Sequence, residues 1–192
     1  MKKVFIVRHA KSSWDDMHLV DYDRPLKGRG VKDAYLVSNW LSQNHERPDA
    51  LYSSPATRAL HTAMIFSRNL QFPFSSINIT EELYMCTPNT LLRFIENTNE
   101  EYDSIMIFSH NPTITDFVNM CQDQEITNVP TSGVVCMHYN IDSWKDISLA
   151  NRVAILNDLD LFVKEINKTA TLIKNEDYIA LEKYFDVASK IR

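Results

Sequence analysis

Short apolar runs recur along the chain and are separated by longer segments in which apolar residues follow helical spacing. Five runs have the length and composition of buried strands: residues 3–7, 50–52, 77–79, 104–108 and 133–139. Polar or turn-forming residues bound these runs, as is typical of strands that stop at the edge of a sheet.

Helices are predicted in the segments between these strands. Residues 29–43 place small and apolar side chains on one helical face. Proline marks the expected start of three more helices: Ser54-Pro55, Thr87-Pro88 and Asn111-Pro112. In the first of these, Ser54 is the expected N-cap. Strands separated by helices at this spacing form βαβ units, so the predicted fold class is α/β, a three-layer α/β/α sandwich with a mostly parallel sheet.

The last part of the chain has a different pattern, because no strand is apparent after residue 144. Two helical faces follow, the first from Val153 to Ile166 and the second from Tyr178 to Ile191. We therefore expect one domain over residues 1–144 and a helical C-terminal extension over residues 145–192 that packs on the same domain. The pattern leaves open whether these helices cover the sheet or form a homodimer contact.

Composition and charge exclude several classes of protein. The net charge of −5 over 192 residues argues against nonspecific nucleic-acid binding, so any anion site must be a local cluster of cations. Only three glycines occur, too few for a Walker loop or a dinucleotide-binding fingerprint. The three cysteines form no C-x-x-C pair, which disfavours structural zinc and indicates buried thiols in a reducing compartment. No signal peptide or membrane span is apparent, so the cytoplasm is the expected location and no membrane partner is expected.

Cations and imidazoles stand where predicted strands end. Arg8 and His9 follow the first strand, Arg58 lies in the first turn of a predicted helix, and His110 follows the fourth strand. Parallel strands bring these residues to one edge of the sheet, which is where ligands bind in open α/β folds. Each of them alone could be an ordinary surface or structural residue. Together, two guanidiniums and two imidazoles near helix N-termini indicate a site for a phosphate.

Four segments resemble the motifs of a known family. Arg8-His9-Ala10 resembles the R-H-G/A signature of the histidine phosphatase (phosphoglycerate mutase-like) superfamily. The stretches at 54–59 (SPATRA) and 109–112 (SHNP) resemble its second arginine and second histidine segments. The stretch at 23–30 (DRPLKGRG) resembles the D-R-P-L segment of the SixA-like branch, which contains small phosphohistidine phosphatases. The resemblance implies a phosphoglycerate mutase-like fold.

The resemblance also implies a mechanism and roles for named residues. His9 is the expected nucleophile, which attacks phosphorus and becomes a phosphohistidine before water releases the phosphate. Arg8, Arg58 and His110 are expected to bind the phosphoryl oxygens and to stabilise the transition state. Ser12 is a further expected phosphate contact. Because the required cations are side chains, no metal or other cofactor is expected.

The proton donor for the leaving group is less well defined by the sequence. Glu82 lies in the loop where the family places such a residue, but it could equally be a solvated loop carboxylate. A phosphohistidine substrate leaves more easily, so a strong acid is not required. Arg24 is expected to lock the loop, Ser132 could reach the site, and His61 is expected to lie outside it.

The expected function is that of a phosphatase acting on phosphohistidine in a protein or on a small phosphoester. The large insertions of mutases are absent between Arg58 and His110, which predicts a shallow, open pocket. Two alternatives use the same residues: a phosphotransferase or mutase, and a non-catalytic phosphate-binding protein. The intact set of catalytic residues argues against the last, since a binder does not need the nucleophile.

Overall fold

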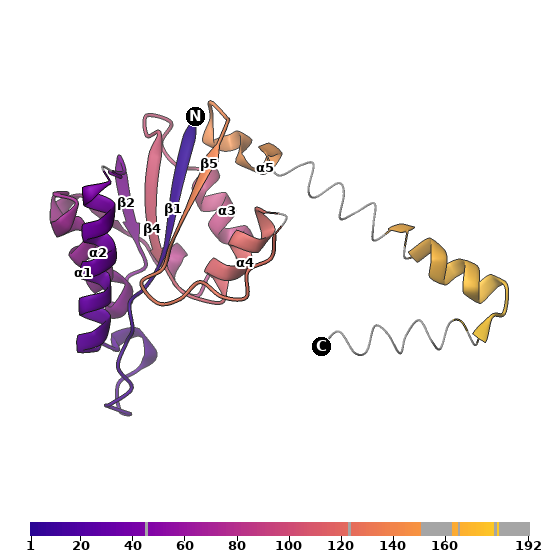
Figure 1. Cartoon of the computed structure of the whole chain (residues 1–192), viewed down its shortest axis with the longest axis horizontal. Coiled ribbons are helices and arrows are strands. Elements are labelled where there is room, and N and C mark those ends of the chain that lie inside the picture. The colour runs from indigo at the N-terminus through magenta and orange to yellow at the C-terminus, as the bar shows by residue number, and fades with distance from the viewer. Residues whose placement is uncertain (45, 123, 151–162, 165, 179, 181–192) are drawn as a thin grey trace. The chain divides into compact units, whose positions relative to one another are not determined.

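A computed structural model describes residues 1–44, 46–122, 124–150, 163–164, 166–178 and 180 (Figure 1). The chain forms two compact units, Met1–Ala150 and Asn151–Arg192. The first unit therefore continues past the predicted boundary at residue 144. Packing of the C-terminal extension on this unit stays a prediction.

The first unit is built on a five-stranded sheet with the strand order β3-β2-β4-β1-β5. The strands are β1 (Lys2–Arg8), β2 (Ala50–Ser53), β3 (Ile77–Ile79), β4 (Ser104–Ser109) and β5 (Val134–Tyr139). The pairs β1–β4, β2–β4 and β2–β3 are parallel, whereas β5 runs antiparallel to β1 at the edge. The parallel strands need crossover connections, and the chain supplies helices for them.

Helices cover both faces of the sheet. Helices α1 (Gly28–Gln43) and α2 (Thr57–Asn69) lie on one face, and α3 (Pro88–Glu96) and α4 (Thr113–Met120) lie on the other (Figure 1). The short α5 (Ile147–Ala150) packs beside α3. The predicted three-layer α/β/α sandwich with a mostly parallel sheet is thus confirmed.

The alternation of side chains along β1 divides the core into two parts. Val4 and Ile6 belong to the cluster under α3 and α4, whereas Phe5 and Val7 belong to the cluster under α1 and α2. All four side chains are buried. Because both faces of the strand are covered, its sequence is continuously apolar rather than alternating.

Two predicted helix starts differ from the observed ones. Helix α2 begins at Thr57 rather than at Pro55, and Ser54 is not its N-cap. The Ser54 hydroxyl instead lies 2.8 Å from Nε2 of His110, so it is engaged in the site rather than in capping. Helix α4 begins at Thr113, one residue beyond the predicted proline start. The start of α3 agrees with the sequence, since Thr87 caps it and accepts a hydrogen bond from the Thr90 amide.

The predicted C-terminal helices lie largely outside the described residues. Residues 163–164 and 166–174 are helical, whereas most of the second predicted face falls on residues that the structure does not describe. Over the described ranges, no helix combines the length and apolar character needed to cross a membrane.

The cysteines are less buried than predicted. Cys136 is exposed on the edge strand, and Cys86 and Cys121 are partly buried.

Candidate active site

The carboxyl ends of three neighbouring strands meet at the site. The residues that end β1 and β4, Arg8 and Ser109, are direct partners across the ladder. The His9 amide continues this ladder by donating to the Ser109 carbonyl at 3.1 Å, and the Ser54 amide donates to the Phe108 carbonyl at 2.9 Å. The backbone thereby fixes the relative positions of the first residues after each strand.

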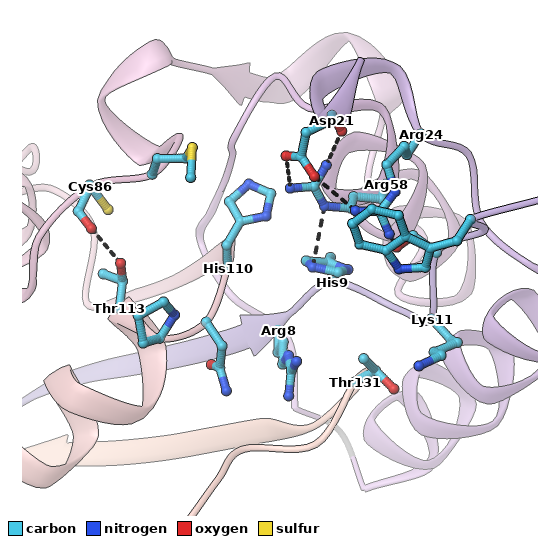
Figure 2. Close-up of a pocket in the computed structure, with 15 residues that line it drawn as sticks. Arg8, His9, Lys11, Asp21, Arg24, Arg58, Cys86, His110, Thr113 and Thr131 are labelled. Carbon is cyan, nitrogen blue, oxygen red and sulfur yellow. Dashed lines mark hydrogen bonds and ion pairs between the residues drawn. The ribbon is translucent and has the colours of Figure 1, made fainter. Parts of the chain in front are cut away.

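A cavity of about 430 Å³ lies at this edge of the sheet (Figure 2). Five of the predicted site residues line it: Arg8, His9, Ser12, Arg58 and His110. The lining also includes the cations of Lys11 and Arg24 and, among the described residues, a single carboxylate, that of Asp21. This local excess of positive charge, on a chain of net charge −5, makes the cavity suitable for an anion.

The imidazole of His9 is oriented by two neighbours. Its Nδ1 lies 2.8 Å from the Ala10 carbonyl oxygen, which assigns the ring proton to Nδ1. Its Nε2 is therefore the unprotonated nitrogen and accepts from Nε of Arg58 at 3.3 Å. Burial, followed by the charge of Arg58, lowers the pKa of His9 to about 4, against a raising contribution from the Ala10 carbonyl. At neutral pH the ring is uncharged, with a lone pair on Nε2.

Arg58 connects His9 to a carboxylate. The first turn of α2 places its guanidinium at the sheet edge, where the side chain is 7% exposed. Its Nη2 donates to Oδ2 of Asp21 at 2.8 Å, and its Nη1 donates to the Asp21 backbone carbonyl. One planar guanidinium thus bridges the imidazole and the carboxylate (Figure 2).

His110 is buried beside His9, with ring centroids 5.1 Å apart. Its Nε2 pairs with Oγ of Ser54, whereas its Nδ1 is buried without a hydrogen-bond partner among the described residues. Burial, and then the charges of Arg58 and His9, lower the pKa of His110 to about 3. The Ser54 hydroxyl can donate to Nε2, and in that tautomer the neutral ring carries its proton on Nδ1, as an unused donor in the cavity.

Arg8 also has an unused donor. Its Nη1 donates to the Val129 carbonyl at 2.6 Å and to Oδ1 of Asn128 at 3.0 Å, which anchors the side chain to the loop before β5. Its Nε is buried and has no partner among the described residues. A buried donor without a partner costs free energy, and a bound oxyanion would relieve that cost at both Arg8 and His110.

Arg24 organises the loop that follows His9. Its Nε donates to the Ser13 carbonyl at 3.0 Å, and its Nη2 donates to Oγ of Ser12 at 2.7 Å. Its Nη1 pairs with Oδ1 of Asp21 at 2.8 Å, and the guanidinium stacks 3.2 Å from the ring centroid of Trp14. Ser12 is buried at the cavity wall, where its hydroxyl accepts the hydrogen bond from Arg24, the residue expected to lock the loop.

The structure does not bring Glu82 into this cavity. The 3-10 turn Glu81–Leu83 buries Leu83 and leaves the Glu82 side chain exposed, beside a separate cavity that Arg93 also lines. The proton-donor role of Glu82 stays a prediction that this geometry does not favour. Asp21 is the carboxylate at the site, and the motif analysis missed it because it stands two residues before the stretch that resembles the family.

The remaining sequence candidates lie at the margin of the site. The amide of Ser132 pairs with the carbonyls of Arg8 and His9 at 3.2 and 3.3 Å, and its hydroxyl is buried without a partner among the described residues. His61 is exposed and does not line the cavity. Across the part of the chain that the structure describes, no cluster of three or more metal-ligating side chains occurs.

Comparisons with known proteins point to the same chemistry. Residues 4–84 match the family model described as "Histidine phosphatase superfamily (branch 1)". A second model, "Prephenate dehydrogenase, dimerization domain", matches residues 137–187.

Similar proteins come from several bacteria. An uncharacterized protein of Mycobacterium leprae is 30% identical over 155 residues, which cover 74% of this chain and 92% of that protein. Phosphohistidine phosphatase SixA of Escherichia coli is 31% identical over 114 residues, covering 58% and 69%.

Solved structures agree with these sequence matches. A structure of the protein histidine phosphatase SixA with tungstate matches with a TM-score of 0.65 and 27% identity, covering 71% of this chain and 88% of that one. The putative phosphohistidine phosphatase SixA from Agrobacterium tumefaciens matches with a TM-score of 0.64 and 27% identity, covering 72% and 92%.

Proposed function

This chain belongs to the histidine phosphatase superfamily and is a phosphatase, and we propose that it hydrolyses phosphohistidine in a protein through a phosphohistidine intermediate on His9. A small phosphoester is the second substrate class that the same chemistry could serve. The proposal rests on the contacts of the four residues Arg8, His9, Arg58 and His110.

The observation that carries the proposal is the pairing of a nucleophile with unused donors. Nε2 of His9 has a lone pair that accepts from Arg58. Nε of Arg8 is a buried donor, and Nδ1 of His110 is a buried ring nitrogen that donates when the Ser54 hydroxyl donates to Nε2; neither has a partner among the described residues. A phosphoryl group bonded to Nε2 has three oxygens that can accept from such donors. A structural role alone gives no reason to bury donors beside an imidazole lone pair.

In the first step, Nε2 of His9 attacks phosphorus and the bond to the leaving group breaks. The Ala10 carbonyl stabilises the positive charge that develops on the ring, because it accepts a hydrogen bond from Nδ1–H. Arg8, Arg58 and His110 hold the equatorial oxygens, which carry most of the charge in the transition state. In the second step, water attacks the phosphohistidine and the Nε2–phosphorus bond breaks.

The substrate proposal draws on the relatives and on the site. The similar protein of Escherichia coli is named a phosphohistidine phosphatase. A protonated imidazole leaves phosphorus readily, which suits a cavity to which the structure does not bring Glu82. Location in the cytoplasm also stays a proposal, made from the cysteine usage.

The test is phosphate release from a phosphohistidine protein and from p-nitrophenyl phosphate, in the presence of a metal chelator. We expect turnover by the wild-type protein, and a loss of at least about a thousandfold for His9→Ala, because the covalent route is removed. His61→Ala, at an exposed histidine outside the cavity, is the matched control and should keep full activity. Wild-type protein inactive on both substrates would overturn the proposal.

The mutase alternative predicts a different fate for the phosphoryl group. A mutase must protect its phosphoenzyme from water long enough to return the phosphate to an acceptor. Phosphorylated His9 that persists for hours without an acceptor would favour that alternative, whereas rapid loss to water favours the phosphatase.

For the C-terminal segment we infer a role in homodimer formation. The match of residues 137–187 to a dimerization-domain model supports it, as do the exposed apolar side chains of Val163, Ile166 and Ile173 in the described helical stretch. Sedimentation of the full chain and of residues 1–150 tests it. A dimer that persists after truncation, or a full chain that stays monomeric at tens of micromolar, would contradict the inference.

A further inference from the structure

The carboxylate of Asp21 has no part in the two steps above, yet among the described residues it is the single carboxylate that lines the cavity. Its Oδ2 takes hydrogen bonds from Nη2 of Arg58 at 2.8 Å and from the Tyr84 hydroxyl at 3.2 Å. Its Oδ1 takes one from Nη1 of Arg24 at 2.8 Å. Three side chains from separate parts of the chain therefore hold this one carboxylate in place.

The position of Asp21 relative to the nucleophile is informative. Arg58 donates from Nε to Nε2 of His9 and from Nη2 to Asp21, so the guanidinium lies between the imidazole and the carboxylate (Figure 2). In phosphoryl transfer the attacking and leaving atoms stand roughly in line on opposite sides of phosphorus. With His9 as the leaving group, water must enter from the side away from the imidazole. Asp21 lies on the far side of the Arg58 guanidinium from that imidazole (Figure 2).

Asp21 has the charge state required to accept a proton from that water. Partial burial works to raise the pKa of Asp21, but the hydrogen bond and charge of Arg58, with the bonds from Arg24 and Tyr84, outweigh it and hold the pKa below its ordinary value. The group is therefore a carboxylate at neutral pH. Its side chain is also 43% exposed, so water can reach it.

We propose that Asp21 is the general base of the second step, an inference that rests on the proposed function of His9. Asp21 takes a proton from water as the water oxygen forms its bond to phosphorus. The bond between phosphorus and Nε2 breaks, and its electron pair returns to the imidazole. The products are inorganic phosphate, neutral His9 and a protonated Asp21, which loses its proton to solvent and pairs with Arg58 again.

A purely structural role for Asp21 makes a different prediction. If the carboxylate only orients Arg58, its loss weakens both steps alike, because Arg58 holds the phosphoryl oxygens in both transition states. If Asp21 is the base, its loss slows the second step alone. A substrate with a good leaving group, such as p-nitrophenyl phosphate, needs no acid in the first step and so separates the two roles.

The experiment is rapid-quench kinetics with p-nitrophenyl phosphate on the full chain and on Asp21→Asn, which keeps an acceptor for Arg58 but removes the base. We expect a burst of p-nitrophenol at a rate within about fivefold of the wild type, followed by turnover slowed about a hundredfold, since general bases typically contribute 10²–10⁴. Phosphate labelled with ³²P should accumulate on the variant protein. The slow step should recover as pH rises, because hydroxide replaces the missing base.

The outcomes are distinct. Asp23→Asn, on the same 3-10 turn but outside the cavity lining, is the matched control and should behave as wild type. Equal slowing of burst and turnover in Asp21→Asn, or unchanged turnover, overturns the inference while leaving the nucleophilic role of His9 intact. A wild-type protein that forms no phosphoenzyme overturns the proposed mechanism itself, and therefore also the proposed role of Asp21.

Discussion

The imidazoles of His9 and His110 lie among arginines, with His110 buried and His9 partly buried, and both effects favour their neutral forms. Their pKa values fall to about 4 and about 3, with burial as the largest cause in each case. In the proposed mechanism the neutral form of His9 is the nucleophile, so the environment that lowers stability in acid would also keep the attacking nitrogen unprotonated. The neighbouring charges would then serve both phosphate binding and activation of the nucleophile.

This arrangement predicts how stability depends on pH. Below pH 6.5, the ordinary histidine pKa, His9 is protonated in the unfolded chain. In the folded protein it stays neutral until the pH falls to about 4. The free energy of unfolding should therefore fall as pH drops from 6.5 to 4, by about 3 kcal/mol for His9. Urea unfolding of His9→Gln across this range should show a shallower fall. His61→Gln is the control, and an unchanged slope in His9→Gln would refute the assignment.

Ser54 gives a second prediction at this scale. Its buried hydroxyl pairs with Nε2 of His110, and when it donates there the ring proton is held on Nδ1, which the proposed mechanism uses to bind a phosphoryl oxygen. Ser54→Ala should lower kcat/KM by about three- to tenfold, the worth of one hydrogen bond, without a large change in the melting temperature. Steady-state kinetics measure this, and a variant with wild-type kcat/KM would show that the tautomer is set elsewhere.

Sequence reasoning located most of the cavity because its principal residues directly follow strands. Arg8, His9 and His110 each follow an apolar run, so their meeting at one edge could be expected from parallel pairing alone; their roles stay predictions. Asp21 could not be found this way, since its position depends on the path of a polar loop. Glu82 was placed by family analogy, and a single 3-10 turn directs it elsewhere.

At the scale of elements, α1 supports the loop that follows His9. Gly30 in its first turn is buried against the Lys11 backbone: a Cβ atom there would stand 2.3 Å from the Lys11 carbonyl oxygen. That carbonyl also accepts from the Lys27 amide at 2.8 Å, immediately before the helix. The two contacts fix the distance between α1 and the residues after His9.

Gly30→Ala should therefore displace this loop. We expect a loss of about 1–3 kcal/mol in the free energy of unfolding, as for other overpacked sites, together with a lower kcat. Gly28→Ala is a matched control in the same helix, because a Cβ atom at that position would meet no neighbouring group within 4 Å. It should be neutral or slightly stabilising. Equal effects of the two substitutions on chemical denaturation would contradict the argument.

Helices and strands were predicted well where periodicity or proline gave a direct signal. The apolar run at residues 104–108 became β4, and Thr87-Pro88 gave the start of α3. The start of α2 was misplaced because Ser54 has a stronger partner in His110 than any helix amide. Capping rules consider only neighbouring residues in the sequence, so they do not predict a contact with a residue as distant as His110.

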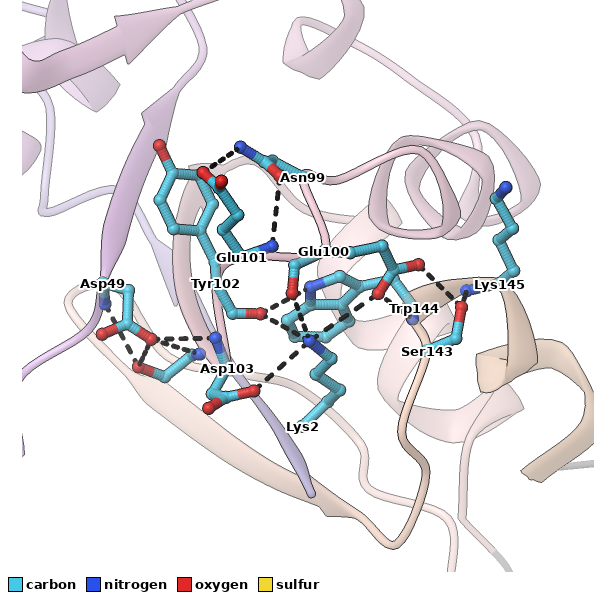
Figure 3. A network of polar contacts seen from close by, with 11 residues as sticks. Lys2, Asp49, Asn99, Glu100, Glu101, Tyr102, Asp103, Ser143, Trp144 and Lys145 are labelled. Carbon is cyan, nitrogen blue, oxygen red and sulfur yellow. Dashed lines mark hydrogen bonds and ion pairs between the residues drawn. The ribbon is translucent and has the colours of Figure 1, made fainter.

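At the scale of the whole molecule, the catalytic unit is Met1–Ala150. In this unit the buried Lys2 connects the first strand to the loop before β4 and to the turn at Trp144 (Figure 3). Nζ of Lys2 donates to the backbone carbonyls of Glu100 and Tyr102 at 2.9 and 2.8 Å and lies 3.3 Å from Oδ1 of Asp103. The indole of Trp144 packs over it and donates to the Tyr102 carbonyl at 2.9 Å. The lysine is 2% exposed, so these partners offset a large desolvation cost.

The network locates the functional end of the catalytic unit. Trp144 and Ile147 are fully buried in the core beneath α3, the first at the predicted boundary at residue 144 and the second beyond it. A chain ending at Ala150 should fold and keep p-nitrophenyl phosphate turnover within about twofold of the full chain. A chain ending at residue 142 lacks both side chains and should lose at least about 3–5 kcal/mol, the usual cost of removing a buried tryptophan. Calorimetry of the two truncations distinguishes these cases, and equal melting temperatures would show that the unit ends before Trp144.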